Sequence, residues 1–206
     1  MKTRCHSWTL WAAVLWLIVG GCVNLEKSYP DKRYFVLENA QRENSGTPKK
    51  GVVLLVSSLR VSPRYDGRSF IYRLSEANFE SDFYNQFLVS PGALLSEEVR
   101  KAVSQAGVAE HVVGTASQLE PTHVLEVTVD ALYGDFRDRT APRAVLEMEF
   151  FLSKDSPLKA EIIARRRYLK SVLVNGGSAE ALVRSWNVAL NEILTAFVTD
   201  LKTVNF

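Results

Sequence analysis

Apolar residues at every second position mark three long segments in the second half of the chain, residues 125–133, 144–152 and 160–174. A period of two places the apolar side chains on one face of a β-sheet and the polar side chains on the other. Glycine, aspartate and proline residues separate the three segments and favour turns. The pattern therefore predicts three strands in an antiparallel meander.

The first half of the chain predicts shorter strands. Residues 34–37 form a compact β-prone run, residues 52–61 open with five consecutive apolar residues, and residues 69–74 follow a turn that contains Pro63 and Gly67. Five apolar residues in a row are typical of a strand that is covered on both faces.

Residues 79–88 have a pattern that fits either a helix or a strand. Phe79, Phe83 and Phe87 lie four positions apart, which suits one face of a helix, but they also share one face of a strand. The residues at the alternate positions, Glu80, Asp82, Tyr84 and Gln86, are polar except for Tyr84. This alternation favours a half-buried strand. This interpretation predicts that the three phenylalanines fill the core and that the polar parity faces outward.

Two helices complete the predicted fold. Ser90 and Pro91 supply a cap and a first turn, and the apolar residues that follow recur at helical spacing until Gly107. A longer helix follows Ser178 and carries a wide apolar stripe in which Trp186 is the largest side chain. Together the elements predict a single α+β domain with a mainly antiparallel sheet and two helices packed on one face.

The beginning of the chain has two cations, an apolar run over residues 8–19, and then Gly20, Gly21 and Cys22. This order is typical of a secretory signal peptide, and a cysteine directly after small residues looks like a bacterial lipobox. In proteins with that motif the signal is removed just before the cysteine, whose thiol carries a diacylglyceryl group.

Two other interpretations of this beginning stay open, an uncleaved membrane anchor and a signal that a cysteine follows by coincidence. A helix needs about 20 apolar residues to span a bilayer, whereas the run here has 12. The favoured interpretation divides the chain into a signal peptide over residues 1–21, a lipidated Cys22 with a tether over residues 22–33, and a domain over residues 34–206.

Charge and cysteine content exclude further classes. The 206 residues include 25 Lys and Arg against 23 Asp and Glu, but Lys2 and Arg4 belong to the signal. A domain with balanced charge lacks the field that attracts nucleic acid, so nucleic acid is not expected as a partner. Cys5 leaves with the signal and Cys22 carries lipid, so no disulfide is expected in the processed chain.

The sequence offers no set of residues for catalysis or metal binding. His111 and His123 open separate predicted strands without a cysteine or carboxylate at ligand spacing, and the chain has no nucleotide-binding glycine loop. Glu147 and Glu149 share a strand face, but a solvated outer face explains them equally well. We expect no enzyme activity, no metal and no cofactor; a periplasmic hydrolase is a minor alternative.

Three consecutive arginines, Arg165, Arg166 and Arg167, lie in the last predicted strand, where the outer two point to one face. Arg165 and Arg167 are candidates for contact with anionic lipid head groups or with an acidic patch on a partner. The alternative is a solvated strand whose arginines pair across to Glu147 and Glu149.

Four parts of the sequence carry a likeness to a known family: Cys22, Tyr34-Phe35-Val36-Leu37, the block of residues 67–95 with Asp82-Phe83-Tyr84-Asn85-Gln86-Phe87, and the closing helix. They resemble the ABC-type transport auxiliary lipoprotein family. The resemblance implies a non-catalytic lipoprotein that accompanies ABC transporters, notably the MCE-type systems that move lipids across the bacterial envelope.

The resemblance also implies a location and partners. A protein of this kind is anchored in the outer membrane, faces the periplasm and docks on a periplasmic MCE-type or other ABC transporter component. Phospholipid and a second copy of the chain are further candidate partners. A structural lipoprotein that helps assemble an outer-membrane or secretion complex is the alternative function.

The likeness is densest over residues 73–88, where aromatic side chains alternate with charges. Arg73, Glu80, Asp82 and Tyr84 are predicted to contact a partner protein, because interfaces favour aromatic and arginine anchors. A half-buried strand at the edge of a sheet would show the same pattern.

Overall fold

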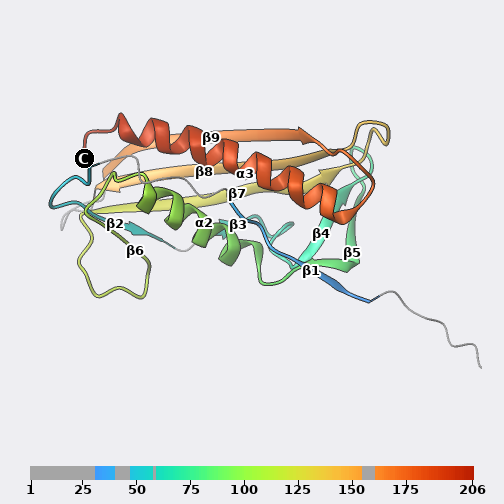
Figure 1. Ribbon diagram of the computed structural model, residues 1–206, viewed down its shortest axis with the longest axis horizontal. Coiled ribbons are helices and arrows are strands. Elements are labelled where there is room, and N and C mark those ends of the chain that lie inside the picture. Colours follow the sequence, from blue (N-terminus) through green and yellow to red (C-terminus); the bar gives the residue numbers. More distant parts are fainter. Residues whose placement is uncertain (1–30, 40–46, 58, 155–160) are drawn as a thin grey trace, which may run out of the picture. The chain divides into compact units, whose positions relative to one another are not determined.

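Two helices lie on one face of a large β-sheet in the computed structural model, which describes residues 31–39, 47–57, 59–154 and 161–206 (Figure 1). The signal and Cys22 lie outside the described residues. Residues 32–206 form one compact unit. Its described strands are β1 (Arg33–Phe35), β2 (Val53–Val56), β3 (Arg60–Val61), β4 (Ser69–Arg73), β5 (Phe79–Phe87), β6 (His111–Val113), β7 (His123–Asp135), β8 (Arg143–Lys154) and β9 (Glu161–Leu173). The described helices are α2 (Pro91–Gln105) and α3 (Ala179–Lys202).

Strand β7 organises the sheet because it has partners on both edges. On one edge β8 pairs with it antiparallel, from His123 opposite Lys154 to Asp135 opposite Arg143. On the other edge β2, β3 and β4 pair with it in succession, and all three run parallel to it. Three short strands therefore flank one long strand, as the turn residues in the first half of the sequence require.

The α+β class with two helices on one face is confirmed, and the sheet is mixed. The predicted antiparallel meander is present as β7, β8 and β9. The first half of the chain adds parallel pairs, among them β1 with β5 and β2 with β6. A parallel pair needs a crossover of about a dozen or more residues. Hydrophobic alternation shows which residues face the core but carries no information about strand direction.

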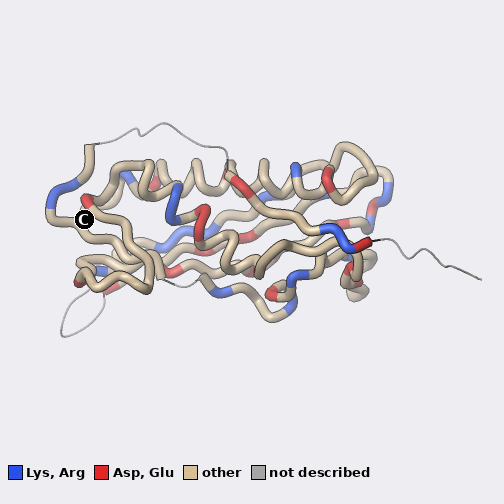
Figure 2. The backbone as a smooth tube through the Cα atoms, turned by 60° about the horizontal axis from the view of Figure 1, so that its bottom comes forward, with Lys and Arg blue, Asp and Glu red and all other residues tan. Residues whose placement is uncertain are grey.

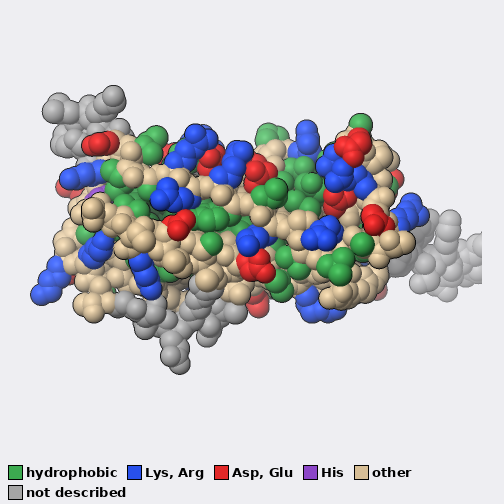
Figure 3. Space-filling model, turned by 90° about the horizontal axis from the view of Figure 1, so that it is seen from above, with side chains coloured by type: hydrophobic (Ala, Val, Ile, Leu, Met, Phe, Trp, Pro, Cys, Tyr) green, Lys and Arg blue, Asp and Glu red, His purple; other side chains and the backbone are tan. Residues whose placement is uncertain are grey.

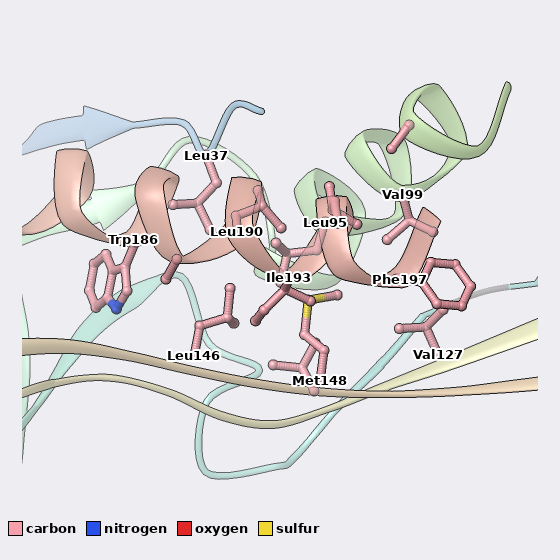
Figure 4. Close-up of a cluster of buried hydrophobic side chains, with 14 of the residues drawn as sticks. Leu37, Leu95, Val99, Val127, Leu146, Met148, Trp186, Leu190, Ile193 and Phe197 are labelled. Atoms are coloured by element: carbon pink, nitrogen blue, oxygen red, sulfur yellow. The ribbon is translucent and has the colours of Figure 1, made fainter. Parts of the chain in front are cut away.

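The core lies between α3 and the strands beneath it (Figure 4). Trp186 is fully buried, and its ring meets Phe70 edge to face with the centroids 5.1 Å apart. Its indole N–H donates a hydrogen bond to the backbone oxygen of Tyr133 at 3.3 Å. Further along the helix, Phe197 stacks on Phe150 with the ring centroids 3.9 Å apart. The predicted apolar stripe of the closing helix is confirmed.

Both helices begin at a serine cap. Ser90 Oγ accepts a hydrogen bond from the backbone N–H of Ala93 at 3.4 Å, and Ser178 Oγ accepts one from Ala181 at 3.2 Å. A cap of this kind satisfies a backbone donor of the first helical turn. The cap of α3 also fixes where this helix starts, at the end of the sheet where β4 and β5 lie (Figure 1).

Charged residues of both signs are interspersed over the described part of the chain. Figure 2 shows basic and acidic positions close to one another along the strands and helices. Figure 3 shows the same mixture of side chains on one face of the molecule, with apolar side chains between them. This distribution agrees with the balanced charge of the sequence.

Candidate functional site

Strand β5 contains a wide bulge opposite β4. Ser69 pairs with Gln86, whereas Ile71 pairs with Ser81, so residues 82–85 of β5 lie opposite the single residue Phe70. The two-residue alternation of a strand does not continue through such an insertion. The bulge, rather than strand parity, therefore decides where the side chains of residues 82–85 point.

Asp82 holds the bulge together. Its Oδ1 accepts hydrogen bonds from the backbone N–H groups of Tyr84 at 2.7 Å and Asn85 at 2.9 Å. Its Oδ2 accepts one from the Tyr72 hydroxyl at 2.6 Å and one from the Asn85 side-chain amide at 2.7 Å. An aspartate that bonds backbone N–H groups just ahead of it forms an Asx-type turn. The carboxylate thus shapes the local backbone.

The hydrogen bonds also decide how Asp82 ionises. Burial by itself would raise the pKa of Asp82, but the hydrogen bonds from Tyr72 and Asn85 outweigh it and hold this pKa below its ordinary value. Burial, followed by the bond to Asp82, raises the pKa of Tyr72. At neutral pH the pair is therefore a phenol that donates to a carboxylate.

The bulge turns Phe83 outward. The side chain of Phe83 is 64% exposed, and the ammonium of Lys32 lies 4.2 Å from its ring centroid. The prediction that three phenylalanines of this strand fill the core is right for Phe87, which is fully buried, while Phe79 is half-buried. It is wrong for Phe83, because a period-two argument assumes a regular strand and cannot see a bulge of four residues.

The other predicted contact residues have separate places. Glu80 is exposed, and Tyr84 is half-buried with its ring edge-on to Phe83 at 5.2 Å between centroids. Arg73 donates hydrogen bonds to the backbone oxygen of Ser75 at 3.3 Å and to a carboxylate oxygen of Glu76 at 3.0 Å, and so closes the β4–β5 turn. Partner contact by Arg73, Glu80, Asp82 and Tyr84 stays a prediction.

An open cleft of about 650 Å³ lies beside the bulge. Residues of β1, β4 and β5, of the β7–β8 turn, and of the first turn of α3 line it. Leu74, Phe136 and Leu182 provide apolar wall, and the backbone of Ser178 and Ala179 adds the start of a long helix. Pockets of about 300–1,000 Å³ that combine apolar wall with a few polar groups are typical ligand sites.

The polar groups of the cleft differ in whether they already have partners. Arg33 Nη1 lies 2.7 Å from Glu180 Oε1, which forms an ion pair at the rim. Among the described residues, the side chains of Glu80 and Arg139 have no ion-pair or hydrogen-bond partner. Asn85 donates its amide N–H to Asp82, and its buried Oδ1 lacks a donor within the same described ranges. The cleft therefore offers a carboxylate and a guanidinium without side-chain partners next to an apolar wall, whereas Oδ1 of Asn85 is shut off from solvent.

Sequence reasoning missed the cleft, although one signal for it was present. Asp82 followed by Asn85 three positions later is typical of a side-chain-stabilised turn, which would have predicted an interruption in β5. Arg33, Arg139 and Ser178 are far apart in the chain, and the tertiary fold alone brings them to one place.

Arg165 and Arg167 lie on the sheet face opposite the helices, because Arg166 between them points to Asp200 of α3 at 3.3 Å. Arg165 Nε donates to Glu149 Oε1 at 2.7 Å, and this bond lowers the pKa of Glu149. Arg167 Nη2 lies 2.7 Å from Asp130 Oδ2. The sequence offered pairing with Glu149 as an alternative, and contact with an anionic partner stays a prediction.

The histidines have the structural positions expected of them. His111 and His123 are the first residues of β6 and β7. Thr122 Oγ1 lies 2.9 Å from Nδ1 of His123, and burial lowers the pKa of that ring. Within the described ranges, no three or more His, Cys, Asp or Glu residues are grouped so that they could hold a metal ion. In the same ranges, no helix is both long enough and apolar enough to cross a membrane.

Comparison with known proteins finds solved structures with a similar fold. No family model matches the sequence, and no curated protein matches it. Among solved structures, the chain is similar to protein XCC0632 from Xanthomonas campestris, which carries the family model DUF330. The TM-score is 0.64 and the identity 16%, over 82% of this chain and 91% of that chain. The two proteins share a fold.

Two further solved structures are also similar to this chain. A protein described only as uncharacterised has a TM-score of 0.65 and 14% identity over 83% of this chain and 99% of that chain. Lipoprotein GNA1162 from Neisseria meningitidis has a TM-score of 0.39 and 13% identity over 70% of this chain and 99% of that chain. We infer nothing about this protein from a likeness at that TM-score. At such identities the first two likenesses show the fold alone.

Proposed function

We propose that this protein is a non-catalytic lipoprotein of the bacterial outer membrane that faces the periplasm and serves as an auxiliary component of an MCE-type ABC transporter of lipids. The observation that carries the proposal is the lipobox-like end of the signal, Gly20-Gly21-Cys22, ahead of the folded domain. The assignment to a transporter rests on the resemblance of residues 34–37 and 67–95 to the auxiliary lipoprotein family.

The structure suggests a surface for the contact with the transporter, and we define it as the Phe83 patch: Phe83, Tyr34, Leu88, Lys32 and Arg68. Phe83, Tyr34 and Leu88 are apolar or aromatic side chains that are at least half exposed. Lys32 lies over the ring of Phe83, and the guanidinium of Arg68 lies 5.3 Å from the ring centroid of Tyr34. Exposed aromatic side chains with arginine beside them are typical of interface anchors.

The anchor is tested by metabolic labelling with a palmitate analogue. One acyl chain gives only marginal membrane binding, whereas two or more hold a protein firmly. We expect wild type and the matched control Cys5→Ser to be labelled and to fractionate with the outer membrane. Cys22→Ser should not be labelled and should no longer fractionate with the outer membrane. Equal labelling of Cys22→Ser and wild type would contradict the lipoprotein assignment.

The partner is tested by photo-crosslinking in cells, with a crosslinking amino acid in place of Phe83. The matched control carries the same amino acid in place of Val188, which is exposed on α3. We expect a crosslink from position 83 to the periplasmic MCE component and none from position 188. Crosslinks to outer-membrane or secretion assembly proteins instead would favour the structural alternative and overturn the transporter assignment.

A further inference from the structure

We propose that the cleft beside the Asp82 bulge binds a short peptide whose two ends are both free, with its ammonium at Glu80 and its carboxylate at Arg139. An apolar side chain of the peptide covers the apolar wall of the cleft. This inference goes beyond the proposed function and does not rest on it, because it depends only on the groups that line the cleft.

Several polar groups of the cleft already have partners within the protein. Arg33 Nη1 lies 2.7 Å from Glu180 Oε1, and the Tyr72 hydroxyl donates a hydrogen bond to Asp82 at 2.6 Å. Oδ1 of Asn85 has no contact with solvent. In the first turn of α3, the carboxylate of Glu180 accepts a hydrogen bond from its own backbone N–H, so this helix end is occupied as well. A ligand is therefore recognised by other groups of the cleft.

Glu80 and Arg139 are charged groups of the cleft that stay available. Both side chains are exposed and line the cleft, and neither has an ion-pair or hydrogen-bond partner among the described residues. They do not neutralise each other, although they share one cleft. A ligand with negative charge alone is repelled by Glu80, and one with positive charge alone is repelled by Arg139. Repulsion of this kind contributes to specificity, so the pair favours a ligand that carries both charges.

The two ends of a free peptide supply these charges in suitable form. A carboxylate accepts two parallel hydrogen bonds from the guanidinium of Arg139. An ammonium offers three N–H donors to the carboxylate of Glu80. In a short peptide the two groups stand at opposite ends of one molecule. This separation matches two side chains that line the same cleft but lie too far apart to form an ion pair with each other.

The apolar wall is formed before a ligand arrives. Leu74, Phe136 and Leu182 provide it, and two of them pack closely over Gly134 of β7. A Cβ atom at Gly134 would lie 2.7 Å from Cε2 of Phe136 and 3.1 Å from Cδ2 of Leu182. The ring of Phe136 also meets that of Tyr72 edge to face, with the centroids 5.3 Å apart. A wall that is held in place in this way loses little conformational freedom when it binds a ligand.

The size of the cleft fits a peptide of a few residues. Its three apolar side chains, from three separate segments of the chain, present a short wall. One aliphatic side chain of a peptide covers such a wall and gains hydrophobic free energy, whereas a long acyl chain would extend past it into water. A volume of about 650 Å³ lies in the usual range for small-molecule ligands. A tripeptide with an apolar residue in the middle therefore suits the site.

The test is isothermal titration calorimetry of the full chain in a non-ionic detergent. The probe is the tripeptide Ala-Leu-Ala in three forms, with both ends free, with an acetylated amino end and with an amidated carboxyl end. Each cap removes one charge and leaves the leucine unchanged. Free Ala-Ser-Ala, which keeps both charges and lacks the leucine, reports on the apolar wall. We expect free Ala-Leu-Ala to bind at least fivefold more tightly than each of the other three peptides.

Two substitutions assign each charge of the cleft to one end of the peptide. Glu80→Gln should bind the free and acetylated forms alike and still prefer the free form to the amidated one. Arg139→Gln should bind the free and amidated forms alike and still prefer the free form to the acetylated one. Glu120→Gln and Arg100→Gln remove an exposed carboxylate and an exposed guanidinium outside the cleft, and both should bind as wild type does.

Four results would overturn the inference. The first is that no form binds or that all three forms bind equally. The second is that one capped form binds as tightly as the free form, because the cleft would then recognise a single chain end, as on a partner protein. The third is that neither cleft variant changes the preferences, or that the two controls change them equally. The last is that lysophosphatidylethanolamine displaces the free peptide at a lower concentration than unlabelled free peptide does, which would assign the cleft to a lipid.

Discussion

Replacing Asp82 with alanine tests whether one carboxylate organises the end of the domain that carries the cleft. The substitution removes the acceptor for the Tyr72 hydroxyl, the Asn85 amide and two backbone N–H groups. A hydrogen bond to a charged group contributes about 1.5–3 kcal/mol. The four bonds do not add in full, because Asp82 is partly exposed and water replaces part of what is lost. We expect Asp82→Ala to lower the free energy of unfolding by about 3 kcal/mol, near the upper end for single substitutions.

The assay is urea unfolding of the full chain in a non-ionic detergent, followed by far-ultraviolet circular dichroism. Glu80→Ala, on the same strand but without a side-chain partner in the described residues, is the matched control and should stay within about 0.5 kcal/mol of wild type. Tyr72→Phe removes one of the four donors and should cost about 1 kcal/mol. If Asp82→Ala unfolds at the same urea concentration as Glu80→Ala, the carboxylate does not hold the bulge.

The difference in unfolding free energy between wild type and Asp82→Ala is expected to depend on pH. The folded-state pKa of Asp82 lies below its ordinary value, which is about 3.9 in an unfolded chain. Its contribution to stability is therefore fully present above that unfolded value, and it is lost as the pH falls through the folded-state pKa. The difference in unfolding free energy between wild type and Asp82→Ala should shrink in acid. A difference that stays constant down to the acid limit of folding would contradict the assignment.

Three further predictions concern the core, the partner surface and the arginines of β9. Trp186→Ala should lower the free energy of unfolding by about 3–5 kcal/mol in the same urea assay, because the ring is fully buried against Phe70; an unchanged midpoint would contradict this packing. Phe83→Ala should leave that midpoint unchanged and reduce co-purification of the periplasmic partner; wild-type yield would remove this residue from the contact. Arg165→Ala should lower the free energy of unfolding more than Glu149→Ala does in the same urea assay, because it leaves the nearly buried carboxylate of Glu149 without its partner at 2.7 Å, whereas Glu149→Ala leaves only a largely exposed guanidinium; a larger loss for Glu149→Ala would contradict this reasoning.

The sequence was sufficient to predict most of the fold because its period-two and helical patterns are regular over β7, β8 and α3. It could not predict that β2, β3 and β4 run parallel to β7, because alternation reports burial and not direction. It also placed Phe83 in the core, because parity arguments fail across a bulge. Arg139 belongs to the candidate site only through tertiary contact, and a single sequence has no local pattern that marks it.

The free edge of β9 has a consequence for the solubility of the protein. Strand β9 pairs with β8 alone among the described strands, so a row of backbone groups along its 13 residues has no strand partner in that part of the chain. An edge of this length can template a second β-strand and lead to aggregation. Arg165, Arg166 and Arg167 stand in the middle of it, and two copies that paired antiparallel about this point would bring like charges together. The arginine run therefore protects the edge against edge-to-edge assembly.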